Sequence, residues 1–327
     1  MISAKDIILG IAATAIPSAL GQGWEPLASV PIGGTLQEHT TVALSDSLLA
    51  VVGGLVEGGA TTDNVLLYDI PTDTWNQASP LPIALNHPNV VGVDGKIYVL
   101  GGLSGESGWP AVKNTFVYDP KTDEWEELQS IPDGLQRGSS VMGVYGSKVY
   151  LAGGIPGTRA SMDDVSIFDL ETLEWLEVPE EASKIPAPRD HGGGAVINGK
   201  FYVVGGRESG LQNVRDTIFI LDLEDLESGW TTSEATMPTA RGGISVAAVG
   251  EKIYVFGGEG NPEEGTNGVF SNVEVYDVEK DEWEELEPMD LPRHGTSAAA
   301  VGGKIYIPGG GVVQGVGATS VFDVYVP

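Results

Sequence analysis

The chain has 327 residues, and its 46 glycines and 20 prolines recur too often for a coiled coil and without the three-residue period of collagen. Its formal net charge of −29 repels nucleic acid and anionic lipid, so we expect neither as a partner. The absence of cysteine excludes disulfides, thiolate zinc sites, iron–sulfur clusters and cysteine nucleophiles.

The first 21 residues have the pattern of a secretory signal peptide. An apolar run covers 7–20, and the small residues Ala19 and Gly21 stand at the end of the segment. The run is too short to span a membrane as a helix. We therefore predict a signal peptide at 1–21, a single domain over 22–327, and a secreted, extracellular protein with no membrane span. The alternative is an ordinary N-terminal segment that is not removed.

An internal repeat dominates the rest of the chain. Six Gly-Gly pairs each follow an apolar stretch, at spacings of 48 residues and then four times 52, and they begin at Gly53, Gly101, Gly153, Gly205, Gly257 and Gly309. An aromatic residue or leucine next to aspartate follows each pair, as at 68–69. A tryptophan then follows in five units: Trp75, Trp125, Trp175, Trp230 and Trp283. Units of about 50 residues with four short strands are typical of propeller blades.

The second unit shows the strand pattern of a blade most clearly. An Asp-Gly dipeptide at 94–95 predicts a hairpin turn into a strand over 96–100. The glycine pair at 101–102 ends that strand where another backbone would approach closely. A third strand covers 114–119, and Trp125 opens a fourth, outermost strand that can cover the seam between blades.

The two ends of the repeat region complement each other. The last unit stops after a third strand over 321–326, without a tryptophan-bearing fourth strand, while 24–27 form a lone strand before the first unit. Pairing these two strands would close the ring and leave no sheet edge exposed. We therefore predict an all-β, six-bladed propeller with four antiparallel strands per blade, closed by the strand around Trp24.

The units resemble kelch repeats in their Gly-Gly pair, their Tyr-Asp pair and their spaced tryptophan. The resemblance covers 24–327 and implies the propeller fold. It leaves the function open, because kelch propellers serve as adaptors, cytoskeletal binders, lectin-like domains, isomerases and oxidase scaffolds. A copper-radical oxidase of the galactose oxidase type needs a cysteine-linked tyrosine, which this chain cannot supply. The Glu-x-x-x-Asp-x-x-x-His run of iron-dependent specifier proteins is also absent.

The resemblance implies a ligand-binding mouth at the top of the channel, where each crossover enters an inner strand. Two repeat positions carry basic residues there, 16 and 14 residues before the first glycine of a pair. The arginines are Arg137, Arg189, Arg241 and Arg293, and the histidines are His39, His87 and His191. Arg207, directly after a Gly-Gly pair, and Trp109 are further expected contacts. Such a mouth suits a carboxylate, phenolate or sulfate. The alternative is that the arginines are structural and hydrogen-bond to neighbouring carbonyl groups.

Three functions remain open from the sequence. The first is binding of an anionic small molecule, a glycan or a peptide at the arginine- and histidine-lined mouth. The second is an isomerase, epimerase, cyclase or lyase, in which His191 beside Asp190, together with His39 and His87, would serve as acid and base. The third is a protein-interaction scaffold.

We expect a monomer with no cofactor. The three histidines of the mouth could converge on a metal ion, since imidazole is a ligand for zinc, copper and iron. No carboxylate is evidently paired with them in the sequence, so we predict no metal site.

Overall fold

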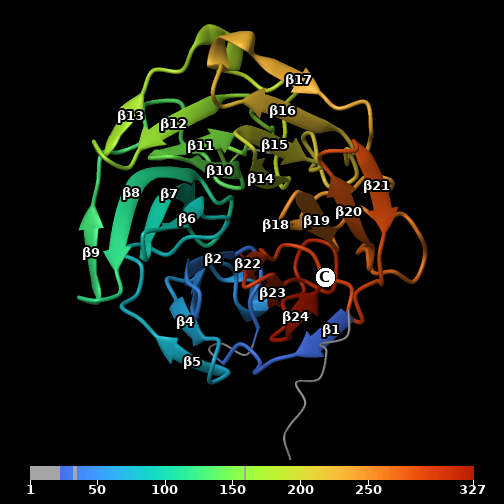
Figure 1. Ribbon diagram of the computed structural model, residues 1–327. Helices are drawn as coiled ribbons and strands as arrows, with labels where there is room; N and C mark the ends of the chain where they lie inside the picture. The colour runs from blue at the N-terminus through green and yellow to red at the C-terminus, as the bar shows by residue number, and fades with distance from the viewer. Residues whose placement is uncertain (1–22, 32–34, 158–159) are drawn as a thin grey trace, which may run out of the picture.

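The computed structural model describes residues 23–31, 35–157 and 160–327 of the chain. In these residues, six four-stranded sheets surround a central axis as the blades of a propeller (Figure 1). This confirms the predicted all-β, six-bladed fold. No helix in this part of the chain is long and apolar enough to cross a membrane. The predicted signal peptide at 1–21 lies outside the described residues.

Within blades one to five, the strands follow one another from the axis outward. Blade one contains β2 (Thr40–Ser45), β3 (Leu48–Val52), β4 (Val65–Asp69) and β5 (Thr74–Gln77). Blade two contains β6 (Val90–Val93), β7 (Lys96–Leu103), β8 (Ala111–Asp119) and β9 (Glu124–Glu127). Blade three contains β10 (Val141–Tyr145), β11 (Lys148–Ala152), β12 (Val165–Asp169) and β13 (Glu174–Leu176).

The remaining blades repeat this plan. Blade four contains β14 (Gly193–Ile197), β15 (Lys200–Val204), β16 (Ile218–Asp222) and β17 (Trp230–Thr232). Blade five contains β18 (Ser245–Val249), β19 (Lys252–Phe256), β20 (Val273–Asp277) and β21 (Glu282–Glu285). Blade six contains β22 (Ala299–Val301), β23 (Lys304–Pro308), β24 (Phe322–Val326) and, from the other end of the chain, β1 (Gly23–Pro26). Short 3₁₀ helices lie in three loops, η1 (Glu57–Gly59), η2 (Glu180–Ala182) and η3 (Leu226–Ser228).

The ring closes as predicted, through the strand from the start of the repeat region. β1 pairs antiparallel with β24, with Trp24 opposite Tyr325, and the two strands lie side by side in Figure 1. The two rings lie 5.0 Å apart, and the indole also contacts the ring of Phe256 in blade five at 5.7 Å. Blade six thus obtains its outermost strand and its seam with blade five from the same short segment.

One hairpin is longer than predicted. In blade two, β7 continues through its glycine pair to Leu103, which pairs with Ala111 at the start of β8. A register shift between Leu100 and Gly102 absorbs the irregularity. The glycine pair bends this hairpin, as glycines do at β-bulges, and does not end the strand.

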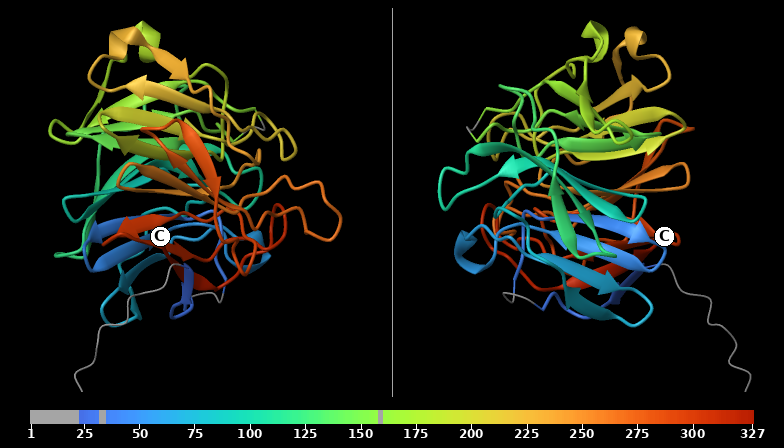
Figure 2. Two further views of the ribbon diagram at one scale, coloured as in Figure 1. Left: turned by 45° about the vertical axis from the view of Figure 1, so that its right-hand side comes forward. Right: turned by 90° about the vertical axis from the view of Figure 1, so that its left-hand side faces the viewer.

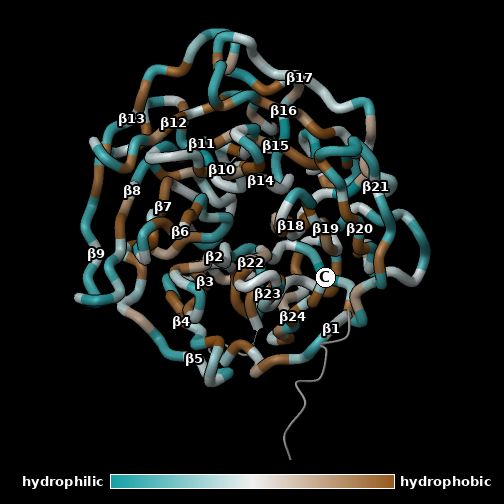
Figure 3. Tube along the Cα trace, viewed as in Figure 1, coloured by the Kyte–Doolittle hydropathy of each residue, from teal (hydrophilic) through white to brown (hydrophobic). Residues whose placement is uncertain are grey.

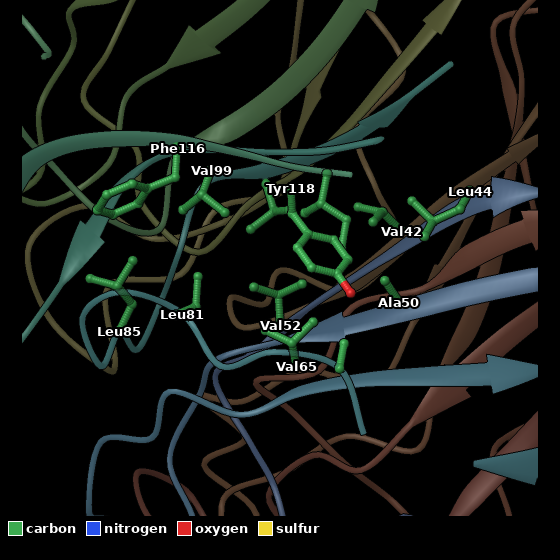
Figure 4. Packing of buried hydrophobic residues seen from close by; sticks show 13 residues of the cluster. Val42, Leu44, Ala50, Val52, Val65, Leu81, Leu85, Val99, Phe116 and Tyr118 are labelled. Atoms are coloured by element: carbon green, nitrogen blue, oxygen red, sulfur yellow. The ribbon is translucent and has the colours of Figure 1, made fainter. Parts of the chain in front are cut away.

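The core lies between neighbouring blades. One cluster joins Val52 of blade one to Val99 and Phe116 of blade two (Figure 4). Outer-strand tryptophans fasten the same seams at the edge, because the indole of Trp125 donates to the carbonyl of Ser79 in the preceding blade at 3.0 Å. The hydrophilic segments gather in the peripheral turns (Figure 3). The predicted role of the tryptophan at the seam is confirmed at this position.

The glycine pairs bring adjacent blades into contact. Gly53 has φ 64°, and a Cβ atom on it would lie 2.5 Å from the carbonyl oxygen of Leu85 in the next blade. The following N–H, of Gly54, donates to that same carbonyl at 2.8 Å. A side chain at Gly53 would therefore separate two blades, which explains why the pair recurs in each unit.

Long connections between the second and third strands emerge on one side of the disc, which we call the top. In the left view of Figure 2, the orange connection between β19 and β20 extends furthest from the body. The crossovers that enter the inner strands reach the axis on the same side. The top loops and these crossovers together form the mouth of the channel.

Candidate functional site

The mouth of the channel holds a cavity of about 720 Å³. Its walls come mainly from the top loops and are largely apolar: Leu55, Leu103, Trp109, Ile155, Leu211 and Val316. Its floor is polar and ionisable: Glu38, His87, Asp190, His191, Arg207 and Glu259. A second, smaller cavity of about 230 Å³ continues down the channel, and Glu38, His87 and His191 line both.

Part of the floor belongs to a ring of six residues around the axis, one from each blade. Every backbone in this ring has a positive φ between 48° and 62°. Each N–H donates to the carbonyl of the residue in the preceding blade, at distances of 2.5 to 3.4 Å, so that the six hydrogen bonds form a closed belt. We call this set the axial ring: Glu38, His87, Ser139, His191, Gly243 and Gly295.

The rest of the floor comes from the residues just before the axial ring and just after the glycine pairs. These two positions bridge each other in each blade, as Asp190 does with Arg207 in blade four. The equivalent pair is Gly242 with Glu259 in blade five, and His294 with Gly311 in blade six. Each blade therefore places three neighbouring residue positions near the axis, and glycines occupy two of the three in blades five and six.

Blade one carries an extra residue in its inner hairpin, and this corrects one predicted position. A β-bulge between Ala43 and Ser45 shifts the pairing of β2 with β3. Glu38 consequently stands 15 residues before Gly53, whereas the other axial residues stand 14 before their glycine pair. Counting back from the glycines selected His39, but the residue in the axial ring is Glu38.

His39 lies below the axial ring and lines the smaller cavity only. Its Nε2 atom is 3.5 Å from the hydroxyl of Thr296, and burial lowers the pKa of His39 to about 4. The structure therefore places this predicted acid–base residue away from the mouth cavity.

The four arginines at the predicted mouth position lie inside the blades. Arg137, Arg189, Arg241 and Arg293 are at most 2% exposed, and none lines either cavity. They precede the residues that face the axis by one position, and neighbouring residues of an extended chain point to opposite sides. The expectation that these guanidinium groups line the mouth is corrected by this placement.

Each of these arginines instead satisfies groups within its own blade. Arg137 donates to the carbonyl of Leu151 at 3.0 Å, and Arg241 lies 2.8 Å from a carboxylate oxygen of Glu274. The guanidinium of Arg293 donates to the Asp323 carboxylate at 2.7 Å. That of Arg189 donates to the Thr217 hydroxyl at 2.7 Å and lies 4.9 Å above the ring of Phe219. These contacts match the structural alternative that the sequence left open.

The structure brings together Asp190, His191 and Arg207, with His87 and Trp109 beside them. The Nδ1 atom of His191 lies 2.5 Å from Asp190 Oδ1, and the Arg207 Nε–H donates to that same oxygen at 2.8 Å. The rings of His87 and His191 are 4.9 Å apart, and the ring of Trp109 is 6.0 Å from that of His87. Arg207 also forms an ion pair with Glu259 through its Nη1 atom.

Burial and charge fix the protonation of this floor. Burial, reinforced by the nearby Arg207 charge, lowers the pKa of His87 to about 3 and also lowers that of His191. Burial alone would raise the pKa of Asp190, but the hydrogen bond from His191 and the charge of Arg207 hold it well below its ordinary value. The floor therefore contains neutral imidazoles, and Arg207 is the one arginine among the described lining residues. Its charge is matched by Asp190 and Glu259, so the floor is not cationic.

Two floor residues, Glu38 and Glu259, were not among the predicted site residues, and neither was His294, which lies buried beside both carboxylates. Glu259 stands directly after a Gly-Gly pair, the repeat position of Arg207, so the spacing does indicate its place at the mouth. His294 stands directly before the axial ring, at the repeat position of Asp190. Glu38 is hidden by the bulge in blade one. The prediction that no carboxylate accompanies the histidines was wrong for the same reason, since Glu38 Oε2 lies 3.2 Å from His87 Nε2.

Comparison with known proteins gives a consistent family assignment. The model of the KLHDC2/KLHL20/DRC7 Kelch-repeats domain matches residues 87–311. Kelch-like protein terF of Aspergillus terreus is 37% identical over 318 residues, which cover 93% of this chain and 68% of that protein. N-(sulfonatooxy)prop-2-enimidothioate sulfolyase of Thlaspi arvense is 31% identical over 118 residues, covering 36% of this chain and 32% of the enzyme. Kelch-like protein 40 of Mus musculus is 33% identical over 186 residues, covering 55% and 28% respectively.

Proposed function

We propose that the mouth cavity of this chain, which belongs to the kelch-repeat family, binds a small organic molecule. Because the kelch fold carries many functions, the residues of the site indicate the role of the protein. The observation that carries this proposal is the cavity of about 720 Å³ with apolar walls and a polar floor. Small-molecule sites typically measure about 300–1,000 Å³ and combine apolar lining with a few convergent polar groups.

The rim of the cavity supports the same proposal. Among the described residues, the large hydrophobic side chains that remain exposed are Leu211, Val313 and Val316, and two of them line the cavity. Exposed apolar side chains grouped at one opening are typical of a binding surface. They would cover the apolar part of a bound molecule and exclude water from the floor.

The floor favours a ligand with a hydroxyl or amino group. Glu38 and Glu259 offer carboxylate oxygens to a hydrogen-bond donor, and the one guanidinium, of Arg207, is already paired with Asp190 and Glu259. An anionic group would meet these carboxylates at short range, which costs free energy in a buried site. We therefore replace the anionic ligand that the sequence suggested by a neutral or cationic one.

The proposal is tested by ligand-observed NMR with a fragment panel of phenols, benzylamines and benzoates of equal size. The variant Val316→Trp fills the cavity at its rim, and Val313→Trp is the matched control, since Val313 is similarly exposed but does not line the cavity. We expect phenols or benzylamines to bind the wild type and Val313→Trp but not Val316→Trp. Binding that Val316→Trp leaves unchanged would contradict the site, and a preference for benzoates would contradict the ligand class.

A second candidate is an enzyme at the same cavity, of the isomerase, epimerase, cyclase or lyase kind. It is favoured by the concentration of ionisable side chains at the floor, where Asp190 and Arg207 hold His191 in one orientation. The test is to recover bound fragments after incubation in D₂O. Rearrangement or deuterium uptake that Asp190→Asn abolishes supports an enzyme. Unaltered return of every bound fragment supports binding alone.

We also infer from the leader pattern at 1–21 that the protein is secreted, and we propose that it is a monomer. A protein-interaction scaffold is the remaining alternative, and the exposed apolar rim would then contact a protein. In light scattering, we expect the mass of a monomer both with and without small fragments.

A further inference from the structure

The side chain of Glu38 is surrounded by three imidazole rings whose nearest nitrogens face it. His87 Nε2 lies 3.2 Å and His191 Nε2 lies 3.9 Å from Glu38 Oε2. His294 Nδ1 lies 3.7 Å from Glu38 Oε1. All four side chains are at most 9% exposed.

The opposite nitrogen of each ring is committed to an acceptor. His87 Nδ1 lies 2.6 Å from the amide oxygen of Asn86, whose own Nδ2 donates to Thr61. His191 Nδ1 lies 2.5 Å from the Asp190 carboxylate, and His294 Nε2 lies 2.9 Å from the carbonyl of Val313.

Oxygen atoms of these kinds accept, so the ring proton of each histidine resides on the outward nitrogen. The inward nitrogens therefore carry lone pairs directed at a carboxylate, and His294 Nδ1 is buried with no hydrogen-bond partner among the described residues. His191 Nε2 accepts a hydrogen bond from Arg207, whereas His87 Nε2 and His294 Nδ1 face the Glu38 carboxylate directly. A proton or a cation between these groups would stabilise that arrangement.

We propose that Glu38, His87 and His191 bind a divalent first-row transition metal ion. Their ligating atoms all lie within 4.8 Å of one another. Two ligands at metal distances of 2.0–2.1 Å in tetrahedral geometry are about 3.4 Å apart, close to the observed separations from Glu38. Two histidines and one carboxylate form a ligand set used by zinc and by non-haem iron, and it leaves coordination positions free.

The surroundings of the three ligands fit this assignment. Metal-bound histidines commonly donate their second N–H to a carboxylate or carbonyl, and here Asn86 and Asp190 accept from His87 and His191. The carboxylates of Glu38, Asp190 and Glu259 outnumber the one guanidinium nearby, that of Arg207, by two, and a divalent ion would balance this difference. Glu38, His87 and His191 line both cavities, so the free positions of the ion face the mouth.

One existing contact would have to be exchanged on metal binding. Arg207 Nη2 donates to His191 Nε2 at 2.9 Å and would give up this hydrogen bond. The Nε and Nη1 atoms of the same guanidinium remain paired with Asp190 and Glu259, so the side chain keeps its position.

The test uses the untagged full chain, stripped with EDTA and titrated with Co²⁺, with the visible absorption of the bound ion as the readout. We expect one Co²⁺ per chain and competition by Zn²⁺. Glu38→Gln, His87→Ala and His191→Ala should each abolish saturable binding, and Asn86→Ala should weaken it roughly 10–100-fold. The matched control is His39→Ala, which removes a neighbouring buried histidine outside the ligand set and should leave the Co²⁺ affinity unchanged.

A second measurement needs no variant. In the wild type with Co²⁺, the Nδ1–H protons of His87 and His191 should give two strongly shifted ¹H NMR signals that disappear in D₂O. Fewer than 0.1 Co²⁺ per chain at millimolar Co²⁺, absence of both signals, or binding retained in folded ligand variants would overturn the proposal. Fragment binding by the EDTA-treated protein tests the proposed function separately, so either proposal can fail alone.

Discussion

Arg241 and Glu274 form an ion pair in which neither side chain has any solvent exposure, with 2.8 Å between the guanidinium and the carboxylate. The sequence had suggested Arg241 as a mouth residue, so its removal distinguishes a binding role from a structural one. Arg241→Ala leaves the Glu274 carboxylate buried without its partner. We predict a large loss of stability and no direct loss of ligand binding.

The magnitude follows from the burial of the pair. Removing one partner of a buried ion pair costs about 3–5 kcal/mol, because the remaining charge stays out of water. For a large single domain, about 2 °C of melting temperature accompanies each kcal/mol, so Arg241→Ala should melt about 6–10 °C below the wild type. Burial lowers the pKa of Arg241 despite the adjacent carboxylate, which agrees with a costly desolvation. The double variant Arg241→Met/Glu274→Leu removes both charges and should recover most of the loss.

Differential scanning calorimetry on four proteins checks this reasoning: the wild type, the single variant, the double variant and Arg215→Ala. Arg215 is one-third exposed and paired with Glu208, so its loss should change the melting temperature by no more than about 2 °C. Fragment and Co²⁺ binding, measured well below the transition, should be the same in all four. A melting temperature of Arg241→Ala within 2 °C of the wild type, combined with lost binding, would refute the structural role.

Three further predictions follow from the seams and the leader. The Tyr276 hydroxyl donates to Asp281 at 2.6 Å, and burial together with this hydrogen bond raises the pKa of Tyr276 to about 12. The protonated hydroxyl stabilises the fold fully below pH 10, and this stabilisation is lost as the pH rises towards 12. Between these values, the free energy of unfolding in urea should therefore depend less on pH for Tyr276→Phe than for the wild type. Trp125→Phe removes the hydrogen bond to Ser79 and should lower the free energy of unfolding by about 1 kcal/mol in the same assay. An unchanged free energy of unfolding would show that this hydrogen bond does not stabilise the seam. Expression in a secreting host should release a chain that begins at Gln22, and N-terminal sequencing of an intact leader in the medium would contradict the predicted cleavage.

Local sequence patterns were sufficient to predict the fold. A glycine pair, a Tyr-Asp pair and a tryptophan report on contacts within one blade or with its neighbour, and those contacts repeat at nearly constant spacing. Gly53 must lack a side chain because the Leu85 carbonyl lies against it, and this requirement is visible in the sequence six times. Ring closure was also predictable, because the lone strand around Trp24 and the incomplete last blade are each visible in the sequence.

The site depended on relations that no repeat spacing expresses. A single bulged residue near Ala43 places Glu38 rather than His39 on the axis, and a one-residue shift changes which side chain faces inward. The same one-residue difference turns Arg189 into the blade while its neighbour Asp190 faces the cavity. The sequence by itself thus determined six blades around a channel. Only the closed ring, which brings Glu38 of blade one within 3.9 Å of His191 in the opposite blade four, decided which charges meet at its centre.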